Sequence, residues 1–542
     1  MSPQVPADDG ARRAVRPGRA ADVGHRDADE LDGADAPVVL PTREDPLAAA
    51  ASAVVGGPAG RRARPGRDPL RAVLVAGTAL GLAVLAAAVV LRDYCRGTVW
   101  STPERFLHAC YSDVPTIWSS GYLDRVVPYL ERFGAPGTGG TYLDVPFGQG
   151  WLLWGLGRLA GGRDATATDV FDLTVVLGAV ALVLLVAATA RVAGRRPWDA
   201  LLVAGSPVVL CCALVGTTLL PAALVVGALW ATSRGRAVTS GVLLGLATLL
   251  WQPAFVVVVA LLLVRLRRRR DATPADDGAA SAVAGPGDDI DEEQRPAAPV
   301  VVDAGVRTAL AALVVWVVGG LPVLVDNSSV WLGAVTARVV NGPGYGSVWL
   351  LGRLLDVPTS VAATTATSLL LAVAGVAAVA LLVLRAPRAP RLPVVALLLV
   401  LVVLLTAPAL PPQAAVVVLP LAALSLPRWR LLLAWGAVEA AAATGTWLYL
   451  YGLEVPERGL PEWGYAVVLV ARLVALVVLG LRAVDITLHP GRDVVRRPAV
   501  EGGPGADDPA LPDDEVDDAV GRAGRHGATA PPDDAATART GA

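Results

Sequence analysis

The stretch AVLVAGTALGLAVLAAAVVL, residues 72–91, is an apolar run without a single charged side chain. A helix needs about 20 consecutive apolar residues to cross the hydrocarbon core of a bilayer. Runs of this kind recur across residues 70–485, and 54% of the 542 residues are hydrophobic. The sequence therefore predicts an all-α polytopic integral membrane protein, located in the cell membrane with several passes through the lipid bilayer.

Polar segments flank and divide this apolar part. Residues 1–69, 265–305 and 487–542 are rich in Asp, Arg, Pro, Gly and Ala and lack hydrophobic periodicity, so we predict cytoplasmic disordered segments there. Between them lie two transmembrane modules, residues 70–264 and 306–486. The first apolar run starts too far from Met1 for a cleavable signal peptide, which predicts a retained first span.

We expect about twelve spans with both termini in the cytoplasm, where basic flanks such as RLRRRR (265–270) belong. Two arginine clusters, RVAGRR (191–196) and SRGR (233–236), then fall on the outer side. Either segment 146–161 does not fully cross, or segment 237–264 is broken at Pro253. The expected spans are residues 72–92, 146–161, 170–191, 200–216, 217–232, 237–264, 306–325, 361–385, 392–407, 413–427, 431–452 and 464–484.

The first outer loop, residues 93–145, is the longest ordered one and is rich in Trp, Tyr and Phe, which suits helices lying at the membrane interface. It contains Cys95 and Cys110, which form either a disulfide or two free thiols. The net charge of −2 gives no global field for nucleic acid. All basic residues are Arg and none is Lys, a bias typical of a GC-rich, bacterial genome.

The segment HACYSDVPTIW, residues 108–118, gathers the most reactive side chains of this loop. Asp113 is a candidate general base, and Pro115 stiffens its backbone. His108 lies near enough along the chain to share a proton with Asp113 or to orient it. The alternative is structural: Asp113 caps an interfacial helix and His108 is an interface residue.

Several blocks of sequence carry a resemblance to a known family. RFLHACYSDVPTIWSSGYLDRVVPYLE (105–131), RRPWDALLVAGSPVVL (195–210), GYGSVWLLGRLL (344–355) and GLPEWGYAVVLVARLVAL (459–476) stand in the family's order. Together they resemble actinobacterial membrane proteins of glycosyltransferase family 87, over roughly residues 70–490. These are similar to polyprenol-phosphate-mannose-dependent mannosyltransferases of the GT-C fold.

The resemblance implies a hexosyltransferase that takes a sugar, with mannose the family's choice, from a polyprenyl-phosphate donor. The acceptor would be an envelope glycolipid or polysaccharide on the outer face. It implies Asp113 as the base, with His108, Tyr111 and Ser112 shaping its pocket. Further substrate contacts are expected from Asp144, from Tyr345 in the loop GPGYGS (342–347), and from Arg125 or Arg338 on the donor phosphate. No cofactor and no metal site are expected.

Other segments depart from the family's pattern: LDVPFGQG (143–150), VGTTLL (215–220), LLWQPAF (249–255) and PPQAAV (411–416) lack its acid, lysine and tyrosines. Two alternative functions therefore remain: a catalytically degenerate paralogue acting as a membrane scaffold or partner, and a transporter. The transporter is disfavoured because the two halves show no clear internal repeat. Glu439, inside an apolar run, is either functional or hydrogen-bonded to a neighbouring Thr or Trp.

Overall fold

The computed structural model describes residues 38–55, 68–134, 140–272, 303–336, 340, 342–357 and 359–496. Within these residues the regular elements are helices, and one isolated antiparallel bridge joins Phe133 with Thr141. The predicted all-α, multi-pass membrane class is confirmed, because six helices are long and apolar enough to cross a membrane. They are α3 (Pro69–Val90), α8 (Ala167–Val192), α15 (Ala304–Asp326), α18 (Val361–Arg385), α21 (Trp429–Glu454) and α22 (Glu462–Leu488).

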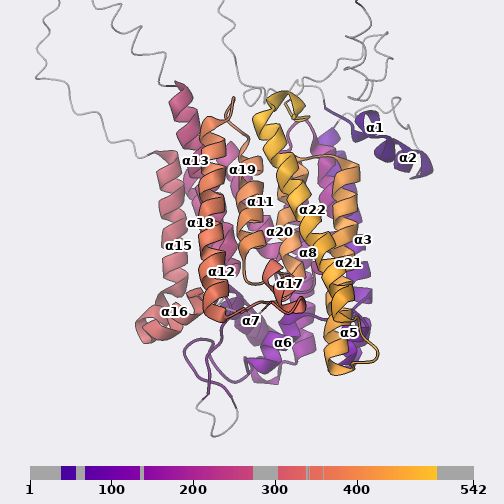
Figure 1. Ribbon diagram of the computed structural model, residues 1–542, viewed down its shortest axis with the longest axis vertical. Helices are drawn as coiled ribbons and strands as arrows, with labels where there is room; N and C mark the ends of the chain where they lie inside the picture. Colours follow the sequence, from indigo (N-terminus) through magenta and orange to yellow (C-terminus); the bar gives the residue numbers. More distant parts are fainter. Residues whose placement is uncertain are drawn as a thin grey trace, which may run out of the picture. The chain divides into compact units, whose positions relative to one another are not determined.

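Shorter elements complete the bundle (Figure 1). Within it lie α9 (Leu201–Ala204), α10 (Pro207–Cys212), α11 (Leu219–Ser233), α12 (Ala237–Leu250), α13 (Phe255–Ala272), α19 (Leu392–Thr406) and α20 (Ala415–Ser425). Around its ends lie α1 (Pro41–Glu44), α2 (Pro46–Val55), α4 (Asp93–Gly97), α5 (Glu104–Leu107), α6 (Asp113–Ser120), α7 (Phe147–Ala160), α16 (Ser328–Thr336) and α17 (Val348–Leu354). Single 3₁₀ turns are η2 (Gly162–Asp164), η3 (Pro197–Ala200), η4 (Gln252–Ala254), η6 (Pro412–Ala414) and η7 (Pro490–Arg492).

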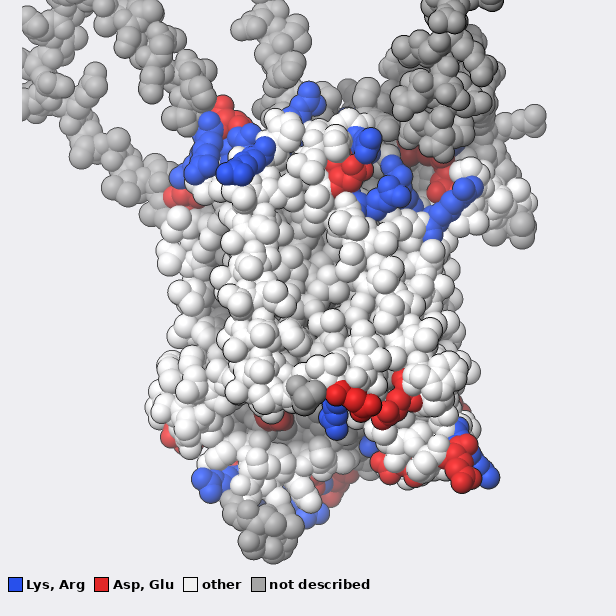
Figure 2. Space-filling view, in the orientation of Figure 1, with Lys and Arg blue, Asp and Glu red and all other residues white. Residues whose placement is uncertain are grey.

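The bundle has two chemically different ends. We call the one that carries α1, α2 and the end of α13 the basic end, and the one that carries α5, α6, α7 and α16 the loop end (Figure 1). Figure 2 shows mainly arginines with some carboxylates at the basic end, carboxylates together with arginines at the loop end, and a band of uncharged side chains between them. This banding is what a bilayer imposes on a protein that crosses it.

One predicted span does not cross the bundle. Within residues 146–161, Phe147–Ala160 form α7, which lies at the loop end beside α6 (Figure 1). Gly150 packs against Tyr129 and Gly157 against Trp118, both in the first loop. The segment lies along the loop end because its small residues accept these aromatic rings.

Another predicted span is two helices. Segment 237–264 turns back at Trp251, whose backbone is extended, and at Pro253 in η4. A proline disfavours helical backbone in the residue before it and lacks the amide to continue the ladder. Gln252 donates from Nε2 to the carbonyl of Ala334, 3.1 Å away, which fixes the turn at the loop end beside α16.

These two changes bring both arginine clusters of the middle region to the basic end. Arg196 pairs with Glu44 of α1 at 2.8 Å and with Asp199 at 2.7 Å. Residues 234–236 join α11 to α12, and the Ala237 carbonyl accepts a hydrogen bond from the Thr308 hydroxyl at the start of α15. The charge conflict in the expected topology is thereby removed.

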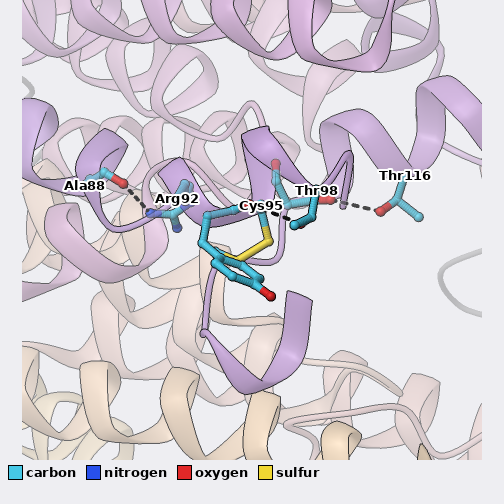
Figure 3. Close-up of a disulfide and its surroundings, with 8 residues drawn as sticks. Ala88, Arg92, Cys95, Thr98 and Thr116 are labelled. Carbon is cyan, nitrogen blue, oxygen red and sulfur yellow. Dashed lines mark hydrogen bonds between the residues drawn. A yellow bond between two sulfur atoms is a disulfide. The ribbon is translucent and has the colours of Figure 1, made fainter. Parts of the chain in front are cut away.

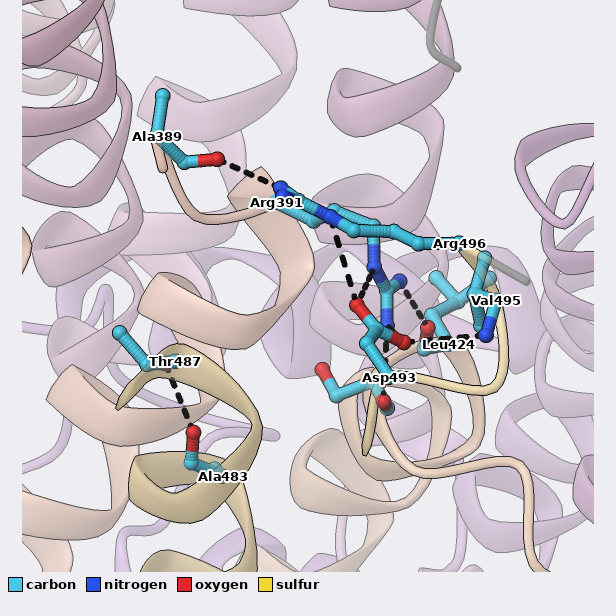
Figure 4. A network of polar contacts seen from close by, with 9 residues as sticks. Ala389, Arg391, Leu424, Ala483, Thr487, Asp493, Val495 and Arg496 are labelled. Carbon is cyan, nitrogen blue, oxygen red and sulfur yellow. Dashed lines mark hydrogen bonds and ion pairs between the residues drawn. The ribbon is translucent and has the colours of Figure 1, made fainter. Parts of the chain in front are cut away.

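The basic end is held by a second buried ion pair, drawn in Figure 4. Arg391, before α19, grips both carboxylate oxygens of Asp493 at 2.8 and 2.9 Å. It also donates to the carbonyls of Leu424 and Ser425 at the end of α20. Residues 487–496 are therefore part of the folded bundle, although the expected boundary lies at 486.

Residues 41–55, inside the segment for which we predict disorder, form the helices α1 and α2. The predicted disorder of 265–305 is also wrong at both ends, because residues 265–272 continue α13 and residues 304–305 begin α15. Residues 1–37, 56–67, 273–302 and 497–542 of the predicted segments lie outside the described residues.

Helices α12 and α15 pack most closely where Gly241 and Gly245, one turn apart, face the backbone of α15. Small residues at this spacing let two membrane helices approach.

Candidate functional site

A disulfide fixes the first loop just before the candidate base. Cys95 in α4 is bonded to Cys110, their Cα atoms are 5.9 Å apart, and both side chains are fully buried (Figure 3). Arg92 anchors the start of this loop by donating to the carbonyls of Ala88 and Cys211. Of the two states left open by the sequence, the structure has the disulfide, which ties the segment before Asp113 to the end of α3.

Asp113 begins helix α6, and the helix start is joined to the turn before α11. Ser112 is the N-cap: its hydroxyl accepts from the Val114 amide and donates to the Val215 carbonyl, both at 3.3 Å. The Asp113 amide donates to the same carbonyl at 2.6 Å. Ser112 is fully buried, so its hydroxyl holds the backbone of Asp113 rather than lining an open pocket.

The carboxylate of Asp113 faces a residue 300 positions away in the chain. Gln413, in η6, donates from Nε2 to Oδ2 of Asp113 at 2.7 Å. A Cβ built at Gly216 would lie 3.8 Å from the same oxygen, so this glycine forms a wall of the site. The arrangement thus presents a half-buried carboxylate at the loop end, with a side-chain amide donating to one of its oxygens.

Tyr111 forms an aromatic side of the site. Its ring lies 4.8 Å from Trp447 and 5.6 Å from Phe106, and the Arg105 guanidinium lies 5.4 Å from its centroid. Burial, followed by the charge of Asp113 and a hydrogen bond to it, raises the pKa of the Tyr111 hydroxyl. The phenol therefore stays protonated at neutral pH and acts as a donor.

Three of the other predicted site residues lie on exposed surface. His108 stacks on Tyr94, with ring centroids 3.6 Å apart, and its side chain is exposed. Arg125 is 76% exposed and pairs with Asp124 at 3.1 Å. Asp144 is exposed on the chain leading to α7. Arg338 lies outside the described residues, so its predicted role is untouched by the structure.

Tyr345 lies in a loop that is pinned rather than free. The Gly344 amide donates to the Pro408 carbonyl and the Leu410 amide to the Tyr345 carbonyl, at 2.9 and 3.1 Å. Gly346, at φ +79°, donates to the Tyr465 hydroxyl at 3.2 Å. The GPGYGS loop is thus fastened to residues 407–414, the connection that carries Gln413, while the Tyr345 ring stays exposed.

Glu439 has a partner that the sequence did not indicate. Arg472 of α22 donates from Nε to Glu439 of α21 at 2.8 Å, and the two side chains are 3% and 1% exposed. We expected a Thr or Trp to be the hydrogen-bond partner of Glu439 and did not predict this ion pair. Arg472, in the middle of the apolar run 464–484, was the available signal, because an ionisable group deep inside a span needs a partner.

Two features bear on what the site can hold. Among the described residues, no group of three or more His, Cys, Asp or Glu side chains is placed to hold a metal ion. On the same loop end, a cavity of about 480 Å³ is lined by Arg353, Asp356 and Thr359 beside the start of α18. The loop end therefore offers a carboxylate, aromatic rings and a separate polar hollow with a cation.

Comparison with known proteins adds no relative: no family model matches the chain, and neither a curated protein nor a solved structure matches it. The functional argument therefore depends on the geometry around Asp113 and on the resemblance of the sequence blocks.

Proposed function

We propose that this protein is a membrane glycosyltransferase of GT-C type that moves a hexose from a polyprenyl-phosphate donor to an envelope glycolipid or polysaccharide. The observation that carries the proposal is the Asp113–Gln413 contact, with Gly216 beside it. Asp113 lies in a block that carries the resemblance, whereas Gly216 and Gln413 lie in VGTTLL (215–220) and PPQAAV (411–416), two segments that depart from the family's pattern. The support is therefore geometric: residues from three distant parts of the chain converge around one carboxylate.

The chemistry that follows is a single displacement. Asp113 takes the proton from an acceptor hydroxyl, and the freed oxygen attacks the anomeric carbon of the donor sugar. The bond from that carbon to the phosphate oxygen breaks, and the lipid phosphate leaves with the electron pair. Gln413 holds the carboxylate of Asp113 in place by donating to Oδ2, and the protonated phenol of Tyr111 orients it from the side.

We further propose the membrane crossing order. The segments are α3, residues 200–216, α12, α15, α19 and α21 in one direction, and α8, α11, α13, α18, α20 and α22 in the other. This order has twelve crossings, as expected, although two of the segments differ from the expected ones. It gathers the arginine clusters at the basic end, which the positive-inside rule assigns to the cytoplasm, and leaves Asp113 on the outer face.

A non-catalytic scaffold of the same fold is the alternative, and one observation favours it. The Asp113–Gln413 hydrogen bond joins α6 to the 407–414 connection, so Asp113 has a structural use without any chemistry. Asp113→Asn distinguishes the catalytic role of Asp113 from the structural one. An asparagine oxygen still accepts the hydrogen bond from Gln413, but it cannot act as a base.

The direct test uses membranes that contain the full chain, supplied with polyprenyl-phosphate donors carrying radiolabelled hexose. Label should move into endogenous glycolipid or polysaccharide with the wild type and fall at least about 10²-fold with Asp113→Asn, the scale of a lost general base. The matched control is Asp164→Asn, an exposed carboxylate at the same end. Equal transfer by wild type and Asp113→Asn contradicts the proposal.

A further inference from the structure

The amide of Gln413 has little to hold it besides Asp113. Its Nε2 donates to the carboxylate, while its Oε1 is buried and has no hydrogen-bond partner in the described part of the chain. The position of the amide is therefore set by the backbone that carries it, the turn η6 at the end of the 407–414 connection.

Arg472 binds this connection through two backbone carbonyls. Its Nη1 donates to the carbonyl of Leu410 and its Nη2 to that of Pro411, 3.3 Å away. These two residues directly precede η6. Glu439 fixes the same guanidinium through Nε at 2.8 Å, so the arginine bridges α21, α22 and the connection. The planar guanidinium fork is needed, because one ammonium group cannot reach three acceptors in this geometry.

We propose that Arg472, oriented by Glu439, is a positioning residue that places Gln413 against Asp113 and thereby sets the base of the reaction. The inference rests on the proposed function for its catalytic consequence, although the positioning itself is testable without it. The contact path is short: guanidinium, two consecutive carbonyls, one turn of helix, one amide and the carboxylate.

The chain contains a matched control for Arg472. Arg391 is also buried, also pairs with a carboxylate (Asp493) and also donates to two backbone carbonyls, but it lies at the basic end. Arg391→Lys and Arg472→Lys therefore remove the same kind of contact at opposite ends of the bundle. Any general loss of folding should affect both variants alike.

The first arm of the experiment measures backbone hydrogen exchange in the purified full-length protein. With Arg472→Lys, amides of residues 409–416 should exchange at least about tenfold faster than in the wild type, because the connection opens locally. With Arg391→Lys, faster exchange should be confined to the basic end. Unchanged protection of residues 409–416 in Arg472→Lys overturns the proposal, whatever the activity.

The second arm measures transfer in membranes with Gln413→Ala, Arg472→Lys and the double variant. Misplacing a catalytic group by about 1 Å costs on the order of 10²-fold, and each single variant should lose that much from kcat with little change in KM. The double variant should be no slower than Gln413→Ala, because both changes break one path. The acidic limb of the pH–rate profile should move to higher pH in both singles, since a carboxylate that loses a donor is harder to ionise.

The outcomes separate the two proposals. Additive losses in the double variant, or a pH profile that moves with Arg391→Lys as well, contradict positioning through Gln413. Full activity of Asp113→Asn together with faster exchange of residues 409–416 in Arg472→Lys refutes the proposed function and supports the positioning of Gln413 by Arg472.

Discussion

Replacing Arg472 by leucine should lower the free energy of unfolding of this protein more than almost any other single substitution in the bundle. The substitution leaves the Glu439 carboxylate, 1% exposed, without its cation. Breaking a buried pair in this way costs about 3–5 kcal/mol. The double variant Glu439→Leu/Arg472→Leu removes both charges and leaves only the carbonyls of Leu410 and Pro411 without donors, a loss of about 1 kcal/mol each. The double variant should therefore be more stable than the single one.

The assay is the free energy of unfolding of the purified protein in mixed micelles, titrated with a denaturing detergent and followed by circular dichroism. Arg353→Leu, an exposed arginine at the loop end, is the control and should change the free energy of unfolding by less than about 0.5 kcal/mol. An Arg472→Leu variant as stable as the wild type, or a double variant less stable than Arg472→Leu, would refute the reasoning.

Three further predictions follow from the loop end. Cys95→Ser/Cys110→Ser should lower the free energy of unfolding by about 3 kcal/mol, the value for a loop closed over 15 residues; an unchanged unfolding midpoint would exclude the disulfide. Gly346→Ala should destabilise by more than about 1 kcal/mol, because its Cβ would meet the Leu410 carbonyl and its φ is +79°, whereas Gly333→Ala, with open space around it, should not; equal unfolding free energies would count against the pinned loop. Single cysteines at Ser120 and Arg163 should react with a membrane-impermeant reagent on intact cells, and one at Arg234 only after permeabilisation; a cytoplasmic Arg163 would mean that α7 crosses after all.

The membrane class follows from sequence alone because hydrocarbon demands long apolar helices. The topology of the middle region does not follow from sequence alone. Run length and hydropathy measure how apolar a segment is, and they do not tell in which direction the chain crosses the membrane. Residues 146–161 are apolar enough for a span, yet they are used to cover aromatic rings of the first loop. Pro253 and the two misplaced arginine clusters were the signals that pointed to the alternative, and the structure contains both of the changes they suggested.

The candidate site was predictable only in part. Asp113 and Tyr111 stand in one short segment, so local chemistry reveals them. Gln413, Gly216 and Arg472 reach the site from other parts of the chain, and only the packing of α10, α11, η6 and α22 brings them together. The exposure of His108 shows the converse: a position near Asp113 in sequence does not place a side chain beside it.

The most direct test of the central claim is the envelope glycan profile of a strain lacking this protein, complemented with the wild type, Asp113→Asn or Asp164→Asn at equal membrane abundance. We expect the deletion to lose a glycan that the wild type and Asp164→Asn restore and Asp113→Asn does not. Restoration by Asp113→Asn would contradict the assignment of Asp113 as the base and leave the scaffold as the better account.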